Sequence, residues 1–511
     1  MNHQQRMKTF HEKRQHQLGM GGKEKLEARK AAGKMNARER IDYFFDSGTF
    51  HELGLFSHSD RPGLERRTPA DGKIIGHGLV HGRPVGVAAN DMTILGASSA
   101  STNMKKIDYI KTVSCEKGIP LVFLGESTGA RMPDVMGSRG MGQGGLNTGQ
   151  YRRLRESPWI SVLLGNIYGS SSWYSAMSDI SVMQKGSIMA VSSPKVTTLA
   201  TGEDTPAEEL GGWKVHADRT GLVDALGETE EACMDLAKAF LDYLPSHCGE
   251  TAPVIKMDGG AETDISDILE IVPEQTNHAY DMKNIIRAIF DGGDFLEVKA
   301  RYGKPCITGF SRLNGVSVGV IANNSFFGAG ALDVDCCEKI TSFLVLCDSF
   351  NLPIISLVDT PGFLIGKAGE QRKITGKIIN WMNALSLVTV PKLTIVIRKL
   401  YGQAYLNMGG GKYSDVLAAW PIADISFMGP EPAMNVVYNL KKEENPEEYH
   451  RLLGQIAEDT EPWGAAGVFG VNEIIDPAHT REFLIQMMEL HHNRKTGGVG
   501  SHLMHNWPTS F

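Results

Sequence analysis

The chain has 511 residues, which is more than one hydrophobic core usually serves, so we expect two large domains. Hydrophobic residues make up 41% of it and charged residues 22%, a composition typical of a globular protein and not of a disordered one. The formal net charge of −7 argues against binding to nucleic acid, because proteins that bind it usually carry a basic domain or face.

The N-terminal segment, residues 1–34, is charged throughout and lacks the apolar stretch of a secretory signal. No apolar run further along the chain is long enough to span a bilayer. We therefore expect a cytoplasmic protein, or a protein of an organelle matrix if a transit peptide has been removed.

The elements that follow occur twice along the chain. The segment 74–90 matches 307–323 without gaps, so that Asn90 aligns with Asn323 at an offset of 233 residues. The same offset aligns further pairs over about ninety positions: Lys106 with Lys339, Pro120 with Pro353, Gly129 with Gly362, and Tyr168-Gly169 with Tyr401-Gly402. A register kept over that length, with glycines at the turns, indicates a tandem duplication.

Each half has the same predicted order of elements. A hairpin with Gly at its turn leads to a β-branched strand, a turn of small residues and a helix. A buried strand introduced by Pro follows, then a glycine turn, a longer helical stretch, a third apolar strand and a third small-residue turn. Strands that alternate with helices indicate an α/β fold. We place the two domains at residues 1–255 and 256–511, with a polar, glycine-rich linker near 245–275.

The third turn of each half is the best candidate for catalysis. Small residues where a strand ends and a helix begins let a ligand approach the backbone, and the first N–H groups of a helix have no partner within it. If two such groups point at one oxygen, they stabilise negative charge on that oxygen, and one donor is worth roughly 3–4 kcal/mol. Gly169-Ser170 and Gly402-Gln403-Ala404 are these turns. A purely structural role in tight helix–strand packing is the alternative.

Several other kinds of site are not indicated. The chain has no GxxxxGK[ST] loop, no GxGxxG after a strand, no HExxH and no Ala-Met-Lys-Met biotinylation sequence. Its seven cysteines show no CxxC spacing, so we expect buried thiols and no metal site. We expect the chain neither to hydrolyse ATP nor to carry a cofactor itself.

A set of segments resembles one family in order and over nearly the whole chain. They are KMNARERIDYFFDSGTFHELG (34–54), GESTGARM (125–132), TGEDTPAEELGG (201–212) with His216, AYDMKNIIRAIFDGGDFLEV (279–298), VDTPGFLIG (358–366), VPKLTIVIRKLYGQAY (390–405) and AAWPIADISFMGPEPA (418–433). They are similar to landmarks of the carboxyltransferase (β) subunits of biotin-dependent acyl-CoA carboxylases, the propionyl-CoA and methylcrotonyl-CoA carboxylase group.

The resemblance implies two crotonase-like ββα-spiral domains and a homo-oligomer with a hexameric core. It implies active sites between the N-terminal domain of one subunit, on the acyl-CoA side, and the C-terminal domain of another, on the biotin side. Biotin would arrive on a separate carrier, so the implied partners are a biotin carboxylase and a biotin carrier subunit. Carboxybiotin would release CO₂, the biotin anion would take the α-proton of the acyl-CoA, and the thioester enolate would attack CO₂.

By position, the resemblance assigns Gly169-Ser170 to the thioester carbonyl and Gln403-Ala404 to the biotin oxygen, while Leu406 would contact the acyl group. Other substrate-binding positions fall in the small-residue turns: Ala97, Ser98, Gly129, Ala130 and Gly362. The chain departs from the family's usual glycines at Ser170 and Gln403. Both changes keep a backbone N–H, and they indicate either neutral drift or an unusual acyl group or direction. Trp173 and Tyr174 could restrict the acyl cavity.

Three alternatives stay open. A decarboxylase component would use the same site in reverse, because the transition state is shared. The GxSxG pattern at 125–129 would suit a serine hydrolase with Ser127 as nucleophile and Asp224 and His278 as partners, although the second half has no serine there. An inactive relative that serves only as a scaffold is the third.

Overall fold

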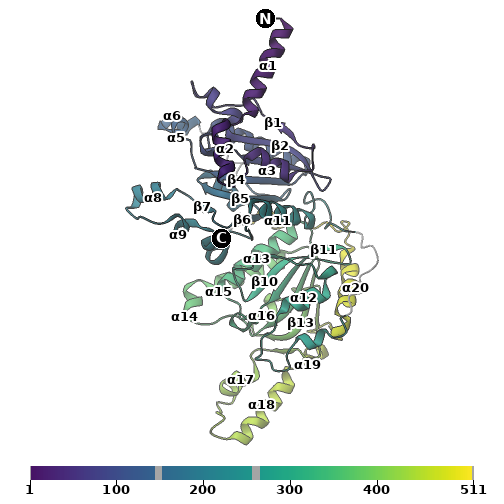
Figure 1. The fold of residues 1–511 in the computed structure, drawn as a ribbon. Coiled ribbons are helices and arrows are strands. Elements are labelled where there is room, and N and C mark those ends of the chain that lie inside the picture. Colours follow the sequence, from purple (N-terminus) through teal and green to yellow (C-terminus); the bar gives the residue numbers. More distant parts are fainter. Residues whose placement is uncertain (1, 144–151, 256–264, 509–511) are drawn as a thin grey trace. The chain divides into compact units, whose positions relative to one another are not determined.

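The structure is a computed structural model that describes residues 2–143, 152–255 and 265–508 (Figure 1). The chain divides into two compact units. The N-terminal unit is Met1–Gly249 together with Asn506–Phe511, and the C-terminal unit is Glu250–His505. Each unit contains an eight-stranded sheet, and the two strand orders correspond, so the predicted α/β duplication is confirmed.

The sheet of the N-terminal unit begins with an antiparallel hairpin and continues as parallel strands, in the order β1-β2-β3-β4-β5-β6-β8, while β7 pairs with β5. Its strands are β1 (His51–Leu53), β2 (Lys73–Val80), β3 (Arg83–Asn90), β4 (Leu121–Ser127), β5 (Trp159–Tyr168), β6 (Ile180–Gln184), β7 (Ile188–Ala190) and β8 (Ala225–Gly227).

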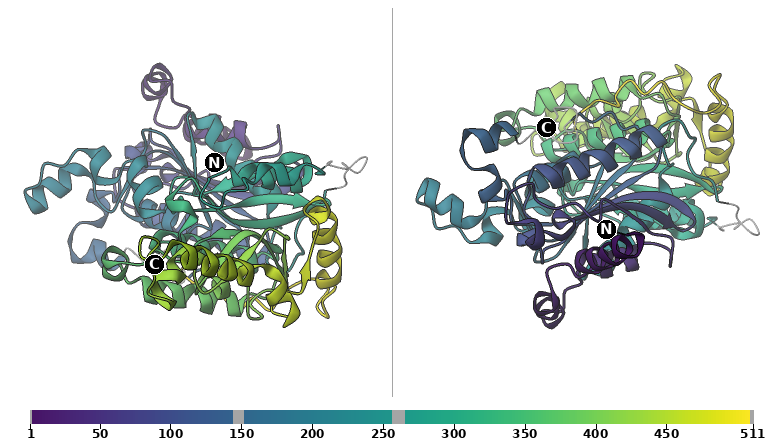
Figure 2. Two further views of the ribbon diagram at one scale, coloured as in Figure 1. Left: turned by 90° about the horizontal axis from the view of Figure 1, so that it is seen from below. Right: turned by 90° about the horizontal axis from the view of Figure 1, so that it is seen from above.

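Helices surround this sheet, and two of them carry most of the packing. The helix α4 (Ser101–Lys117) packs on β2 and β3, and α11 (Glu230–Tyr243) packs on β5 and β6. The segment with α8 (Pro194–Thr201) and α9 (Ala207–Gly211) extends away from the sheet of its unit, as Figures 1 and 2 show. The other helices of the unit are α1 (His3–Leu18), α2 (Lys23–Ala31), α3 (Ala37–Phe44), α5 (Met132–Val135), α6 (Gly137–Gln143), α7 (Ser170–Met177) and α10 (Trp213–Val215).

The C-terminal unit repeats this plan with the order β16-β14-β13-β12-β11-β10-β9, while β15 pairs with β13. Its strands are β9 (Leu296–Val298), β10 (Cys306–Leu313), β11 (Val316–Asn323), β12 (Ile354–Thr360), β13 (Lys392–Tyr401), β14 (Val416–Ala419), β15 (Asp424–Ser426) and β16 (Glu473–Ile474). Its helices are α12 (Met282–Ile289), α13 (Val334–Ser349), α14 (Lys367–Gln371), α15 (Ile374–Leu387), α16 (Ala404–Asn407), α17 (Pro430–Val437), α18 (Pro446–Thr460), α19 (Pro462–Gly467) and α20 (Thr480–His492).

Strand register shows how far the duplication extends. Gly86 pairs with Leu121 on β4, and Gly319 pairs with Ile354 on β12, so both partners keep the offset of 233. The pairing of Ile160 with Ile180 instead corresponds to that of Leu393 with Val416. The C-terminal unit therefore carries three extra residues between these strands, and the offset changes after the third turn.

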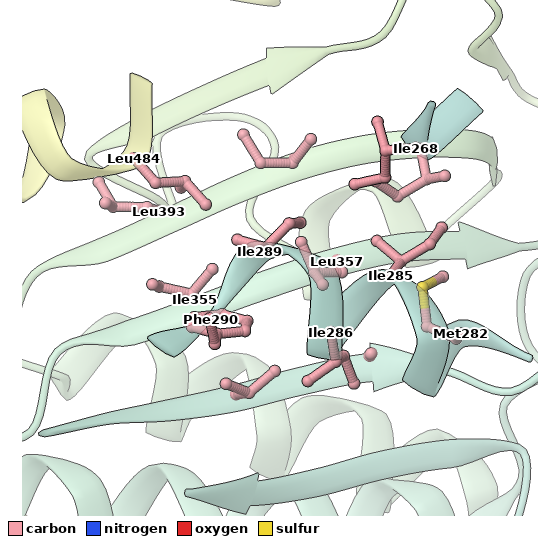
Figure 3. Packing of buried hydrophobic residues seen from close by; sticks show 14 of the residues in the cluster. Ile268, Met282, Ile285, Ile286, Ile289, Phe290, Ile355, Leu357, Leu393 and Leu484 are labelled. Carbon is pink, nitrogen blue, oxygen red and sulfur yellow. The ribbon is translucent and has the colours of Figure 1, made fainter. Parts of the chain in front are cut away.

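The core of the C-terminal unit forms where α12 lies on its sheet (Figure 3). Ile285, Ile286 and Ile289 are fully buried, and their spacing places them on one face of the helix. They meet Ile355 and Leu357, which alternate along β12 and therefore point to the same side of the sheet. Burying such a side chain is worth about 1.5–3 kcal/mol, so these contacts hold the helix firmly on the sheet.

Two further findings concern the cysteines and the membrane. All seven cysteines are free thiols, and Cys115 and Cys248 are the two that are only partly buried. Within residues 2–143, 152–255 and 265–508, no helix has the length and apolar character needed to cross a bilayer.

Candidate active site

In the N-terminal unit three turns meet at the edge of the sheet where β3, β4 and β5 end. The N–H of Ser99 donates to Gly129 O at 2.8 Å, and the N–H of Arg131 donates to Ser99 O at 2.8 Å. A Cβ atom at Gly169 would lie 3.6 Å from Gly129 Cα. The backbone around Ala97-Ser98, Gly129-Ala130 and Gly169-Ser170 is thus gathered in one place, because parallel strands bring their carboxyl ends to one edge.

Gly169 forms the turn between β5 and α7, with φ 64° and ψ −135°. This left-handed conformation favours glycine. Its carbonyl accepts the N–H groups of Ser172 and Trp173, at 2.9 and 3.4 Å. Its own N–H donates to Val191 O at 3.2 Å, so it is already used.

The unused donors lie one residue further along. Among the described residues, no acceptor faces the N–H groups of Ser170, Ser171 and Ala130. Of the sequence-based pair Gly169-Ser170, Ser170 therefore has a free N–H together with Ser171, while Gly169 turns the chain. We call Gly169–Ser171 the first donor turn.

Hydroxyl groups line the first donor turn. Ser170 Oγ donates to Ser99 Oγ at 2.9 Å, and no acceptor for the Ser99 hydroxyl hydrogen is present in the described part of the chain. Tyr174, expected to restrict an acyl cavity, is instead 1% exposed. Its ring packs in the core 6.0 Å from those of Phe123 and Trp159. Trp173 remains 42% exposed, because successive helix positions face different sides.

The second donor turn, Gly402–Ala404, repeats this geometry in the C-terminal unit. Gly402 has φ 60°, and its N–H donates to Ser426 O at 2.9 Å. The N–H groups of Gln403 and Ala404 have no acceptor within the described residues. They are offset by 233 from Ser170 and Ser171. Gln403 Nε2 donates to Asn407 Oδ1 at 3.3 Å, so the larger side chain folds back along α16 and leaves the backbone pair uncovered.

Gly362 and Leu406, the other two residues that the sequence indicated in the C-terminal unit, lie near the second donor turn. Gly362 O accepts the N–H of Leu332 at 2.9 Å, which repeats the contact between Gly129 and Ser99. A Cβ atom at Gly362 would lie 3.2 Å from Tyr401 O, beside the second donor turn. Leu406 is half-buried on α16, where its N–H donates to Gln403 O at 3.1 Å.

Ser127 has a structural role that is incompatible with the nucleophile of a serine hydrolase. Its side chain is fully buried, and its Oγ donates to Ala97 O and accepts the N–H of Gly129, both at 3.1 Å. Thr360 repeats both bonds, to Gly330 O at 2.8 Å and from Gly362 N at 3.2 Å. A hydroxyl engaged in this way on both sides joins two turns and is not an exposed nucleophile.

One partner proposed for that hydrolase is already engaged, and the other belongs to the second unit. Asp224 Oδ2 accepts the N–H of Ser181 at 2.7 Å, and His278 belongs to the C-terminal unit. The serine-hydrolase hypothesis is therefore abandoned.

Buried charges hold the turns in place. Burial alone would raise the pKa of Glu126, but the guanidinium groups of Arg40 and Arg29 hold that pKa below its usual value. Glu126 therefore stays ionised as part of an ion-pair network. Lys73 is fully buried, burial lowers its pKa to about 7, and its Nζ donates to Ala97 O at 2.8 Å.

Sequence reasoning missed Ser99, Ser171 and Lys73. Ser171 could have been found, because the offset of 233 aligns it with Ala404. Nothing in the local pattern pointed to Ser99 or Lys73, whose roles depend on contacts with residues 71 and 24 positions away.

Each of the two duplicated α/β units therefore presents, among its described residues, a pair of unused backbone N–H groups at a glycine turn. The chain belongs to the carboxyl transferase domain family, which matches residues 28–500. The family indicated by the sequence motifs is therefore confirmed, and so is its assignment as an enzyme that transfers carboxyl groups.

Relatives match over nearly the full length. The propionyl-CoA carboxylase carboxyltransferase subunit of Haloferax mediterranei is 36% identical over 95% of this chain and 96% of its own. The methylmalonyl-CoA carboxyltransferase 12S subunit of Propionibacterium freudenreichii subsp. shermanii is 34% identical over 96% and 95%. The methylmalonyl-CoA decarboxylase subunit alpha of Propionigenium modestum is 33% identical over 92% of each.

A crystal structure of transcarboxylase 12S is similar, with a TM-score of 0.90, 32% identity and 97% of each chain covered. That protein forms a hexamer, the core of a multienzyme, and was seen with methylmalonyl-CoA and methylmalonic acid bound.

Proposed function

We propose that this chain is the carboxyltransferase subunit of a biotin-dependent acyl-CoA carboxylase. The observation that supports this proposal most strongly is the repeated pair of unused N–H groups, Ser170-Ser171 and Gln403-Ala404. Two separate anionic oxygens arise when a carboxyl group moves between biotin and the α-carbon of a thioester. Two donor pairs on equivalent turns suit that requirement.

In the N-terminal unit, the N–H groups of Ser170 and Ser171 would donate to the thioester oxygen as the enolate forms. Ala130 contributes a third unused N–H beside them. Donors fixed by the strand–turn–helix backbone need no reorientation as charge develops, which is the property that lowers the barrier. This unit is therefore proposed as the acyl-CoA side, with Ala97, Ser98 and Gly129 shaping its floor.

In the C-terminal unit, the N–H groups of Gln403 and Ala404 would hold the ureido oxygen of biotin. Biotin, carried on a separate protein or domain, supplies the nitrogen that carries the carboxyl group. The donor set fits this group, because a ureido oxygen that gains negative charge needs N–H donors. Gly362 and Leu406 border the same position, and Leu406 would contact the acyl group.

The similarity to transcarboxylase 12S supports a homo-oligomeric, hexameric core. By the same reasoning, each active site would combine the N-terminal unit of one subunit with the C-terminal unit of another. The expected partners are a biotin carboxylase and a biotin carrier subunit, and the expected location is the cytoplasm.

Decarboxylation is the second candidate, favoured by the 33% identity to a methylmalonyl-CoA decarboxylase subunit alpha over 92% of both chains. Because the transition state is common to both directions, the donor turns suit either one.

A transfer assay with free biotin tests the function. The purified chain is incubated with biotin and malonyl-CoA, methylmalonyl-CoA or 3-methylglutaconyl-CoA labelled with ¹⁴C in the carboxyl group. We expect the label to leave at least one thioester and to become acid-labile. Retention of the label by every thioester would contradict the proposal, and failure of any acyl-CoA to bind in calorimetry would favour the inactive scaffold. Assays with the carrier and its partner enzymes, in both directions, then separate carboxylation from decarboxylation.

A further inference from the structure

One segment that resembles the family, TGEDTPAEELGG (201–212) with His216, contains no residue of either donor turn. It ends the arm of residues 191–212, whose helices α8 and α9 extend away from the sheet (Figures 1 and 2). His216 then begins η5 (His216–Thr220), a short π-helix. Such π-helices are rare and are frequent at functional sites.

The imidazole of His216 is 9% exposed and is bonded on both sides. Its Nε2 lies 2.7 Å from Met189 O, and its Nδ1 lies 3.1 Å from Thr220 Oγ1. Because a carbonyl oxygen can only accept, Nε2 carries the proton and Nδ1 accepts the hydroxyl of Thr220. Burial lowers the pKa of His216 against the opposing effect of the bond to Met189 O, so the imidazole is neutral at pH 7.

The end of the arm also packs against Met189 O. A Cβ atom at Gly211 would collide with that oxygen, so no larger residue fits at this position. Gly212, the next residue, forms an antiparallel bridge with Ile188. The end of the arm and His216 therefore hold β7 together.

The strand β7 in turn holds the first donor turn. Met189 pairs in register with Ile167 on β5, two residues before Gly169. Val191, the residue after β7, accepts the N–H of Gly169 at 3.2 Å. A displacement of Met189 would therefore pass along two residues to the carbonyl that fixes the glycine of the turn.

The C-terminal unit fixes the corresponding strand, β15, with other side chains. The hydroxyl groups of Thr460 and Tyr401 donate to the carboxylate of Asp424 at 3.3 and 3.5 Å. Ser426, the last residue of β15, accepts the N–H of Gly402 at 2.9 Å. A change at His216 should therefore affect the first donor turn and leave the second one intact.

We propose that His216 is a positioning residue, which fixes the strand end Met189–Val191 and thereby aims the N–H groups of the first donor turn at the thioester oxygen. The proposal rests on the proposed function, because it assumes that a thioester oxygen lies at this turn. Donors lower the barrier when their direction is set before charge develops, so a loosened strand end would cost rate.

Two substitutions separate the bond to Met189 from the loss of the imidazole itself. The amide nitrogen of His216→Gln can take the place of Nε2, whereas that of His216→Asn takes the place of Nδ1. We expect the kcat of carboxyl transfer between a carboxylated acyl-CoA and biotin to fall about tenfold in His216→Asn and to stay within about threefold in His216→Gln. The KM for each substrate should change by less than about threefold, because the lost stabilisation belongs to the transition state.

Thr220→Val is the matched control. It removes the hydroxyl at Nδ1 and keeps the bond from Nε2 to Met189 O. Its kcat should stay within about twofold of the original chain.

A bound enolate gives a second readout that does not depend on turnover. Acetoacetyl-CoA ionises to an enolate with its own ultraviolet absorbance, and N–H donors at the thioester oxygen favour that form. We expect the pKa of acetoacetyl-CoA to be about one pH unit higher when it is bound to His216→Asn than to His216→Gln, which matches a tenfold difference in kcat.

Equal kcat values in His216→Asn and His216→Gln, at a temperature where both remain folded, would overturn this role of His216. So would a rise in KM without a fall in kcat. Both results leave the proposed function intact, because the original chain still transfers carboxyl groups. If the original chain neither transfers carboxyl groups nor binds acetoacetyl-CoA, the proposed function fails, and the role of His216 fails with it.

Discussion

Lys73 is an unusual residue for the interior of a protein, since its ammonium group is fully buried and has a backbone carbonyl, Ala97 O, as its acceptor. Burial lowers its pKa from 10.5 to about 7, and the nearby charge of Arg131 acts in the same direction. Between those two pH values the unfolded chain holds a proton that the folded chain has lost. The free energy of unfolding therefore rises with pH in this window. Below pH 7 both states hold the proton, so Lys73 adds no further pH dependence there.

The variant Lys73→Met isolates this effect. We expect urea unfolding to show that the stability of the original chain, relative to the variant, increases by about 1 kcal/mol for each pH unit from 7 to 9. The variant Lys23→Met removes an exposed lysine and controls for the loss of a charge. A difference between Lys73→Met and the original chain that stays constant with pH would contradict the buried, neutral state of Lys73.

Ser170 stands where the family usually has glycine, and its hydroxyl occupies space beside the unused N–H pair. In Ser170→Gly the backbone donor remains, while the hydroxyl and its bond to Ser99 are lost. We expect transfer to continue and selectivity to relax, with kcat/KM for a branched acyl-CoA relative to acetyl-CoA rising about threefold or more.

The variant Ser99→Ala complements that experiment, because it removes the acceptor of the Ser170 hydroxyl and keeps the hydroxyl itself in place. It should leave the selectivity nearer to that of the original chain. An identical acyl-CoA preference in Ser170→Gly and in the original chain would mean that the hydroxyl does not border the acyl group.

At the scale of elements, the turns that follow the strands are built twice by the same bonds. Ser127 and Thr360 each donate to the carbonyl of the preceding turn and accept an N–H from the glycine two residues on. Both adjoining strand pairs also shift register at this point, between Gly125 and Ser127 and between Val358 and Thr360. The shift re-aims the chain after the strand and so presents the glycine turn at the sheet edge.

Much of this element plan could be predicted from sequence, because the glycines of the turns and the apolar strands recur at a constant offset. The duplication and the positions of Gly169 and Gly402 follow from that pattern alone. The identity of the donors could not be predicted in the same way. Gly169 N–H is occupied by Val191 O, and Val191 follows β7, beyond the point where the offset changes by three residues.

The buried network of ion pairs and hydrogen bonds around the turns could not be predicted from local sequence patterns either. Arg131 Nη1 donates to Asp71 Oδ1 at 2.6 Å, and this pair is separated by 60 residues. Ser127 looked like a nucleophile because GxSxG is a short pattern, and only its full burial and its two hydrogen bonds identify it as a link between turns. Contacts of this kind depend on tertiary packing and not on sequence spacing.

At the scale of the whole molecule, the proposed carboxyl transfer uses two donor turns, one in each unit, that act on two oxygens. The glycine that forms each turn has a positive φ, 64° at Gly169 and 60° at Gly402. A Cβ atom at Gly402 would lie 3.2 Å from Phe427 O, and one at Gly169 would lie 3.6 Å from Gly129 Cα. An alanine at either position would strain the turn by about 1–2 kcal/mol and displace the N–H groups that follow it.

Gly186 provides the matched control. It also has a positive φ, 85°, but a Cβ atom there would meet nothing within 4 Å. Gly186→Ala therefore carries comparable backbone strain at a residue that belongs to neither donor turn.

The most direct measurement is the kcat of carboxyl transfer between a carboxylated acyl-CoA and biotin in Gly169→Ala, Gly402→Ala and Gly186→Ala, at a temperature where all three remain folded. Since one donor of this kind is worth about 10²–10³ in kcat, we expect a fall of at least about tenfold in each of the first two variants. In Gly186→Ala the kcat should stay within about twofold of the original chain. If Gly169→Ala and Gly402→Ala transfer carboxyl groups as fast as Gly186→Ala does, the two donor turns do not hold the transition state.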